Sequence, residues 1–247
     1  MSAFRGLADL RASSFEPVGI LWFLGSPLPD AVWFGVLGLL FVSGLVVLTG
    51  RAARPAMVVF TPCVLVVTTY RSSWGQLLWF ENLLVIHLIV LTVAAVTGPI
   101  DAIRPPPWAM QCCAVATVVL YVLAGVAKLR YGGLGWISGD VLANHIGYSS
   151  ARLSVFGEQP PLLASFAVNH PGALTIASFA TVTSELGAPL ALLGRRLAIV
   201  WSSVMWATHV GIALTMAVVF PYPLVGLAFV PVVAVAGCMS LRRTGTK

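Results

Sequence analysis

Five ionisable side chains lie inside long apolar runs of this sequence, and they are the residues whose types could do chemistry. They are one lysine, two glutamates and two histidines: Glu81, His87, Lys128, Glu185 and His209. Ionisable groups are costly inside a bilayer, so each one is a candidate functional residue. An amine, two imidazoles and two carboxyl groups in a medium of low dielectric constant are suited to proton transfer. Desolvation favours the neutral amine of a lysine, which is the form that can act as a base.

Lys128 ends the apolar run 110–127, and two interpretations of it stay open. A lysine where a helix leaves hydrocarbon either reaches the lipid headgroups or is retained for chemistry. The other ionisable residues have structural interpretations too. His87 and His209 are candidates for hydrogen bonds between helices, and Ser184 or a neighbouring helix would satisfy Glu185.

The composition indicates a membrane protein. Hydrophobic residues make up 59% of the 247, charged residues 9%, and the mean hydropathy is +0.96. Soluble domains carry about 25% charged residues, so this chain has too few to cover a surface that faces water. We therefore expect an integral membrane protein.

Several classes of function lack their sequence signals. There is no GxSxG, Walker loop, HExxH or glycine-rich dinucleotide turn. The four cysteines lie in apolar runs without ligand spacing, so we predict no metal site. The formal net charge of +6 comes from basic residues in short loops, which indicates membrane orientation and not nucleic-acid binding.

Seven apolar runs are expected to span the bilayer, since a spanning helix needs about 20 residues. The five clear runs are 31–48, 77–97, 110–127, 172–193 and 197–219, and the two weaker ones are 56–70 and 224–241. The run 17–24 is too short to cross alone. The sequence thus predicts an all-α, polytopic transmembrane bundle of about seven to eight spans in a single domain, 1–247.

The distribution of Lys and Arg predicts a cytoplasmic C-terminus and an outer loop, 129–171, that forms a lid over the bundle. Helix rise then gives approximate depths. Glu81 and Lys128 are expected near the outer boundary, with Asn82 beside them. His87 and His209 are expected about 15 Å from the outer face. Glu185 is expected deeper, towards the cytoplasm.

One motif carries a family resemblance. The phrase Tyr121-x-x-Ala-Gly-x-x-Lys128-Leu, followed by Trp136-x-x-Gly139, resembles the HTTM (horizontally transferred transmembrane) family, which includes the membrane domain of vitamin-K-dependent γ-carboxylase. Weaker points of likeness are Trp74, Asn82, Asp101-Ala102, and His209 followed by Phe220-Pro-Tyr222.

The resemblance implies a role for two residues. By position, Lys128 would be the base that deprotonates a vitamin K hydroquinone, and His209 would be a pocket residue. A reduced quinone and molecular oxygen would be the co-reactants. The chain departs from the carboxylases at Leu83 and Ala127 and in having no large extramembrane domain. We therefore expect quinol-type or other base-driven chemistry in place of glutamate carboxylation.

A second resemblance concerns the DoxX-like membrane proteins, which are small quinone-linked bundles. It rests on Ala-Gly-x-x-Lys-Leu and on Glu185-x-x-x-Pro-x-x-Leu-x-Gly-Arg195. Trp136-x-x-Gly139 and the long outer loop favour the HTTM family.

The leading prediction is a membrane enzyme that acts on a lipophilic quinol or isoprenoid-like substrate. The predicted catalytic residues are Lys128, Glu81 and His209, and the predicted substrate-binding residues are Asn82, His87, Tyr121, Trp136 and Glu185. One alternative is a membrane-bound terpenoid cyclase with Glu81 or Glu185 as proton donor. Another is a non-catalytic scaffold or peptide-maturation protein, so a protein partner is left open.

Overall fold

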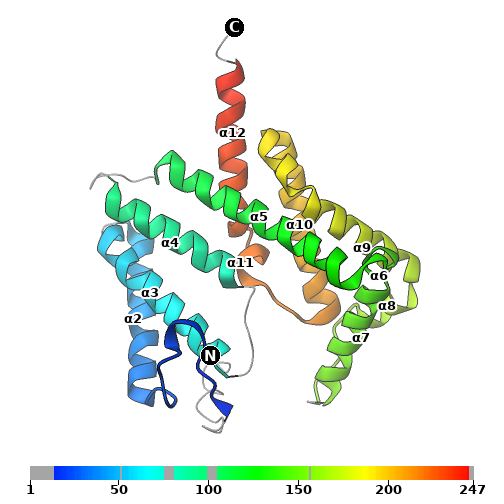
Figure 1. Ribbon diagram of the computed structural model, residues 1–247, viewed down its shortest axis with the longest axis horizontal. Coiled ribbons are helices and arrows are strands. Elements are labelled where there is room, and N and C mark those ends of the chain that lie inside the picture. The colour runs from blue at the N-terminus through cyan, green and yellow to red at the C-terminus, as the bar shows by residue number, and fades with distance from the viewer. Residues whose placement is uncertain (1–13, 51, 75–80, 99–104, 156, 245–247) are drawn as a thin grey trace. The chain divides into compact units, whose positions relative to one another are not determined.

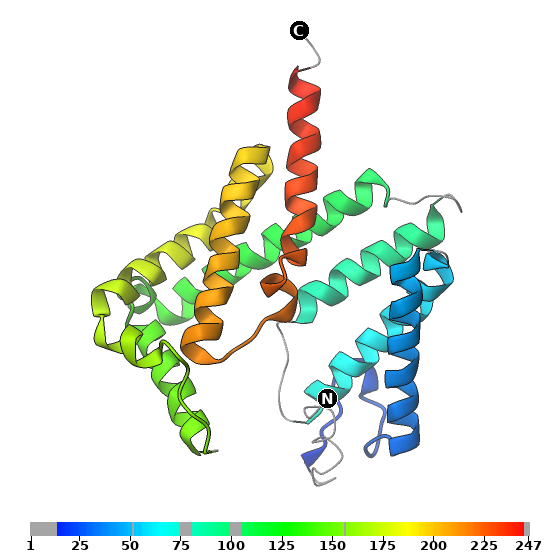
Figure 2. The ribbon, with the colours of Figure 1, turned by 180° about the vertical axis from the view of Figure 1, so that it is seen from behind.

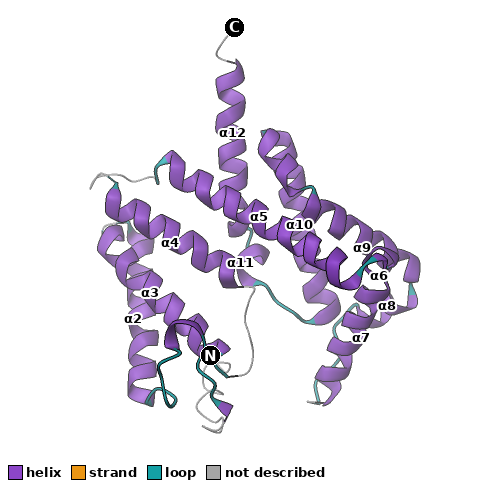
Figure 3. Ribbon diagram, in the orientation of Figure 1, coloured by secondary structure: helices purple, strands orange, loops and turns teal. Residues whose placement is uncertain are grey.

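The computed structural model describes residues 14–50, 52–74, 81–98, 105–155 and 157–244, with the side chains of 238–244 left out. Every regular element within these ranges is a helix, as Figure 3 shows, so the predicted all-α class is confirmed there. The predicted likeness at Asp101-Ala102 lies outside the described residues.

The chain forms two compact units, residues 1–109 and 110–247 (Figure 1). The boundary falls near the start of α5. Each unit is described by itself below.

The α-helices described in the first unit are α2 (Asp30–Thr49), α3 (Ala53–Ser72) and α4 (Asn82–Thr97). Helix α3 packs against both of the others, as the ribbon in Figure 2 shows. Gly50 ends α2 with φ of 70°, a left-handed conformation that glycine adopts without steric cost.

The segment before α2 is held against the end of α3. Residues 17–24 contain only a 3₁₀ turn, η2 (Gly19–Leu21), so the structure has no additional spanning helix there. The Val18 backbone N–H donates to Ser73 Oγ, and the Glu16 N–H donates to the Ser73 carbonyl. The aromatic rings of Phe15, Trp33, Tyr70 and Trp74 pack together beside this turn.

Arg54 joins the start of α3 to the end of α4. Its guanidinium donates to the Ala95 carbonyl at 2.5 Å and to the Gly98 carbonyl. The last carbonyls of a helix have no partner within the helix, so Arg54 supplies donors that α4 itself lacks.

The second unit contains a longer series of elements. They are α5 (Pro107–Gly132), α6 (Leu134–Ser138), α7 (Asp140–Val155), α8 (Ala164–Asn169), α9 (Pro171–Leu186), η4 (Ala188–Leu193), α10 (Arg195–Met216), α11 (Pro221–Leu224), η5 (Leu227–Phe229) and α12 (Val230–Thr244). Its main core lies where α5, α10, η4 and α12 meet, around Tyr121, Trp201, Met205 and Phe229.

Residues 129–171, expected as a loop, are largely helical, because α5 continues to Gly132 and α6, α7 and α8 follow. Two glycines make the bends: Gly133 has φ of 55° and Gly139 has φ of 91°. Gly139 also allows close packing, since a Cβ there would lie 2.9 Å from the Thr175 backbone nitrogen.

In the part of the chain that the structure describes, four helices, α2, α3, α5 and α10, are long and apolar enough to cross a membrane. This does not confirm the seven to eight spans predicted from the sequence. The run 172–193 is divided, because α9 ends at Leu186 and Pro189 cannot continue an α-helical hydrogen-bond ladder. The run 224–241 is divided as well, since Gly226 adopts φ of 80° and α12 begins only at Val230.

Candidate functional site

Helix α5 presents three residues of the HTTM-like motif on one face. Tyr121, Gly125 and Lys128 follow at intervals of four and three, so they lie one above the other on a helix. A Cβ added at Gly125 would lie 3.1 Å from the Cβ of Glu185 and 3.1 Å from Leu186 Cγ. Gly125 therefore allows α9 to pack closely against this face of α5.

Lys128 and Glu185 form an ion pair at that crossing. Lys128 Nζ lies 2.5 Å from Glu185 Oε1, and the two side chains are 21% and 7% exposed. The second carboxylate oxygen of Glu185 is buried and has no hydrogen-bond partner among the described residues. The indole of Trp136, on α6, lies 5.3 Å from Lys128 Nζ, within range of a cation–π contact. The amine is thus held between a carboxylate and an aromatic ring.

The expected depth of Glu185 is corrected by this contact. Glu185 was predicted to lie deeper than Lys128, but atoms 2.5 Å apart lie at the same level. The depth estimate placed Lys128 at the outer end of its helix, whereas α5 continues to Gly132 and α9 crosses it one turn before Lys128.

A second polar pair lies two turns before Lys128 on α5. The Tyr121 hydroxyl and His209 Nε2 are joined by a buried hydrogen bond of 2.7 Å. Aromatic rings surround the pair, with Phe220 5.0 Å from His209 and Trp201 5.2 Å from Tyr121 between ring centroids. The other ring nitrogen of His209, Nδ1, is buried without a partner among the described residues.

The two pairs belong to one neighbourhood. Trp201 Nε1 donates to the Ser184 carbonyl at 2.9 Å, which ties α10 to the residue before Glu185. Tyr121 packs on Trp201 and also reaches His209.

The remaining predicted site residues belong to the first unit. Glu81, which was expected at the same depth as Lys128, pairs with Arg71 at 2.8 Å, and its Oε2 is buried without a partner among the described residues. Asn82 is exposed at the start of α4. His87 is 1% exposed on the buried face of the same helix.

Ser178, Ser202 and Trp201 were not predicted as site residues from the sequence. The two serines are buried, and their hydroxyl groups have no partner among the described residues. A signal for them is nevertheless present in the chain. Ser178 precedes Glu185 by seven residues and Ser202 precedes His209 by seven, which places each serine on the same helix face as its ionisable partner.

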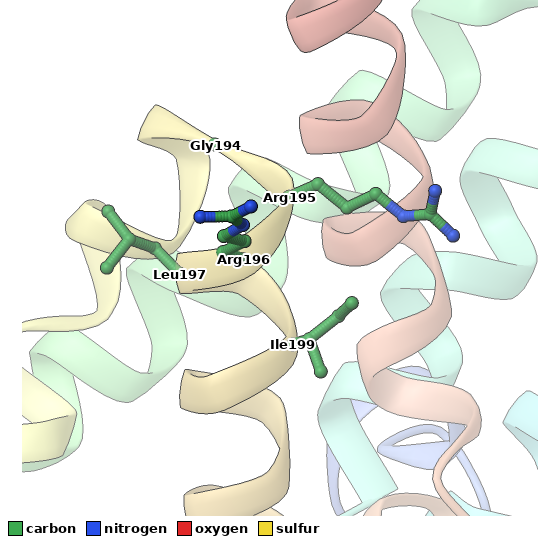
Figure 4. Close-up of a pocket in the computed structure, with 5 residues that line it drawn as sticks. All are labelled: Gly194, Arg195, Arg196, Leu197 and Ile199. Atoms are coloured by element: carbon green, nitrogen blue, oxygen red, sulfur yellow. The ribbon is translucent and has the colours of Figure 1, made fainter.

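No cluster of three or more His, Cys, Asp or Glu side chains within the described ranges is placed to hold a metal ion. An open hollow lies at the start of α10, lined by Gly194, Arg195, Arg196, Leu197 and Ile199 (Figure 4). Arg195 extends from it towards α12. None of the predicted site residues lines this hollow, so we do not place the chemistry there.

Comparison with known proteins adds no further assignment: no family model, no curated protein and no solved structure matches this chain.

Proposed function

We propose that the chain is an integral membrane enzyme of the HTTM type, in which Lys128 and Glu185 remove a proton from a lipophilic quinol. The observation that carries the proposal is the 2.5 Å contact between these side chains, with one oxygen of Glu185 left buried and unpartnered. Burying a carboxylate oxygen without a hydrogen-bond partner costs about 1–3 kcal/mol of stability. A purely structural ion pair with Lys128 would not require that cost.

The pair can exist in two forms that contain the same number of protons and differ in which group holds one of them. One is ammonium with carboxylate, and the other is amine with carboxylic acid. Burial in a medium of low dielectric constant makes the neutral form accessible. In that form Lys128 Nζ takes the proton of a quinol hydroxyl, the electron pair stays on the quinol oxygen, and the new ammonium stabilises the oxyanion.

Oxygen is the second co-reactant in this proposal, as the resemblance implies. One quinol and one O₂ give one quinone epoxide and one water, so the equation balances without a further reductant. The chain's own residues supply the base, the charge that stabilises the oxyanion, and the apolar surroundings. Trp136 shields one side of the amine, and Tyr121 with His209 forms the other polar part of the site.

The proposal includes the predicted topology. Helices α2, α3, α5 and α10 are long and apolar enough to cross the bilayer. The shorter helices α4, α9 and α12 would complete seven spans. The C-terminus lies in the cytoplasm, on the same side as Arg195 and Arg196 at the start of α10. Cysteine labelling from either side of the membrane tests this orientation.

Turnover can be measured with the purified protein in lipid nanodiscs. Reduced menaquinone is added in air, and oxygen uptake and quinone epoxide are followed against empty nanodiscs. The wild type is expected to exceed that background. Lys128→Arg keeps the positive charge, but a guanidinium does not deprotonate in proteins, so uptake is expected to fall to background.

The matched control is Arg130→Lys, two residues further along α5, where the guanidinium lies 5.5 Å from the Tyr131 ring. This variant is expected to keep full activity. Full epoxide formation by Lys128→Arg would overturn the base role of Lys128.

A terpenoid cyclase is the second candidate, and the buried, unpartnered oxygen of Glu185 favours it. A neutral carboxyl there could protonate a terminal alkene of a polyprene, and loss of a proton from the cyclised cation would give an isomer of the substrate. Incubation with geranylgeraniol tests this. An isomer with fewer double bonds, lost in Glu185→Gln and kept in Lys128→Arg, would select the cyclase over the quinol enzyme.

A further inference from the structure

The inner faces of α9 and α10 contain four buried polar atoms without partners among the described residues. They are Ser178 Oγ, Glu185 Oε2, Ser202 Oγ and His209 Nδ1. All four side chains are more than nine-tenths buried, and Ser178 is fully enclosed. Buried polar groups in proteins are nearly always hydrogen-bonded, to protein or to ordered water. Four such atoms on two adjacent helices therefore point to something bound between them.

The spacing of these residues places them along continuous faces. On α9 the buried residues Leu174, Ser178, Val182 and Glu185 form one stripe. On α10 the corresponding stripe includes Ser202, Met205 and His209. Each stripe thus has a hydroxyl two helical turns before its ionisable residue.

Contacts between the helices bring these stripes to the two polar pairs. Trp201 donates a hydrogen bond to the Ser184 carbonyl. Ser202 follows Trp201 and Glu185 follows Ser184, so both lie next to this contact. His209 is tied to Tyr121 by the 2.7 Å hydrogen bond. Ser202 therefore lies on the stretch of α10 between the Lys128–Glu185 pair and the Tyr121–His209 pair.

We propose that Ser178, Ser202 and the unpartnered atoms of Glu185 and His209 bind a chain of buried water molecules that carries protons between the two pairs. Water fits this role because each molecule donates and accepts, and so satisfies a carboxylate oxygen, a hydroxyl and either tautomer of an imidazole. A proton that arrives on the Lys128–Glu185 pair leaves through Glu185 Oε2 and reaches His209 Nδ1. Only the proton moves, and the base is restored for another turnover.

The presence of the water is tested without any substrate. The full chain in nanodiscs is exposed to brief radiolysis, in which hydroxyl radicals form from water in place and oxidise adjacent methionine. Met205 lies three residues after Ser202 and four before His209 and is 1% exposed. Met57 is the internal control, because it is 8% exposed and packs with Val64 and Leu88 in an apolar cluster.

Met205 is expected to be oxidised several-fold faster than Met57, although Met205 is the less exposed of the two. Ser202→Val is expected to lower the Met205 rate, while Ser203→Val, at the exposed neighbouring position, leaves it unchanged. Ser178→Ala is a second, smaller substitution with the same expected direction. Met205 oxidised no faster than Met57, or a rate unaffected by both Ser202→Val and Ser178→Ala, would overturn the water chain.

The relay role rests on the proposed function, and it has a separate readout. In the quinol assay, Ser202→Val is expected to slow turnover several-fold without changing the KM for quinol, and to increase the solvent deuterium isotope effect. Unchanged turnover and an unchanged isotope effect would overturn the relay. A wild type with rapid Met205 oxidation but no turnover would contradict the quinol function and leave the water site in place.

Discussion

The Tyr121 hydroxyl and the His209 ring are joined by a buried hydrogen bond of 2.7 Å, although the residues are 88 positions apart. This bond connects α5 to α10 inside the second unit and leaves His209 Nδ1 as the ring nitrogen that faces the interior without a partner among the described residues. The tautomer of His209 therefore depends on Tyr121. If the hydroxyl donates to Nε2, Nδ1 carries the proton, and if Nε2 donates, Nδ1 is a free acceptor.

Tyr121→Phe removes this bond and keeps the shape of the ring. His209 Nε2 would then be buried without its partner, so the free energy of unfolding is expected to fall by about 1–3 kcal/mol. Chemical denaturation in detergent, followed by tryptophan fluorescence, measures the change. Tyr131→Phe, at a side chain 81% exposed, is the control and is expected to stay within about 0.5 kcal/mol of the wild type. Equal stability of Tyr121→Phe and wild type would show that the bond does not hold the helices together.

The Lys128–Glu185 pair is expected to show strong coupling in a double-mutant cycle. Lys128→Met or Glu185→Leu alone leaves a largely buried charge without its partner, which costs about 3 kcal/mol. The double variant removes both charges and is expected to recover most of that loss, because neither group is left uncompensated. Denaturation of the three variants gives the coupling energy. If the stability loss of the double variant equals the sum of the losses of the two single variants, the ion pair does not form.

Gly125→Ala tests the close approach of α5 and α9. Its new Cβ would lie 3.1 Å from Glu185 Cβ and from Leu186, so the two helices must separate. Gly211→Ala, on α10, is the matched control, because a Cβ there meets nothing within 4 Å. The control gains up to about 1 kcal/mol from helix propensity, whereas Gly125→Ala loses about 1–2 kcal/mol net through overpacking. The prediction is contradicted if both variants are stabilised equally.

Arg54→Gln is expected to loosen the end of α4. The guanidinium donates to the Ala95 and Gly98 carbonyls, and hydrogen bonds from a charged group contribute about 1.5–3 kcal/mol. Hydrogen–deuterium exchange should accelerate in the last turn of α4 and remain unchanged in α10, which belongs to the other unit. Arg54→Lys keeps one cationic donor and should give an intermediate rate. An unaltered exchange profile in Arg54→Gln would show that the cap contributes nothing.

Much of the helical framework could be predicted from hydropathy and glycine positions. The runs around α2, α3, α5 and α10 are long and apolar, and a chain that spans a membrane satisfies its backbone groups within each helix, so the sequence predicted helices there. The close crossing at Gly125 was predictable for a similar reason, since small residues mark the contacts between membrane helices. The break at Pro189 was visible in the sequence, but the apolar composition on both sides of it favoured one continuous span.

The partner of Lys128 could not be predicted in the same way. Glu81 and Lys128 were both expected near the outer boundary, but pairing depends on which helices cross and at what residue, and α9 crosses α5 beside Glu185. The helices of 129–171 were missed because polar residues interrupt the apolar pattern there. The serines at positions 178 and 202 could have been found from their spacing of seven to Glu185 and His209, since two turns of a helix return to the same face.

The central claim, that Lys128 removes a proton from a bound quinol, is tested most directly by spectroscopy without oxygen. Reduced menaquinone is titrated into nanodiscs that contain wild-type protein, Lys128→Arg or Arg130→Lys, with binding followed by tryptophan quenching and deprotonation by the red-shifted absorption of the quinolate. The proposal predicts binding by all three proteins and a quinolate band in the wild type and in Arg130→Lys, but not in Lys128→Arg. A quinolate band of equal intensity in Lys128→Arg, or bound quinol that stays protonated in the wild type, would contradict it.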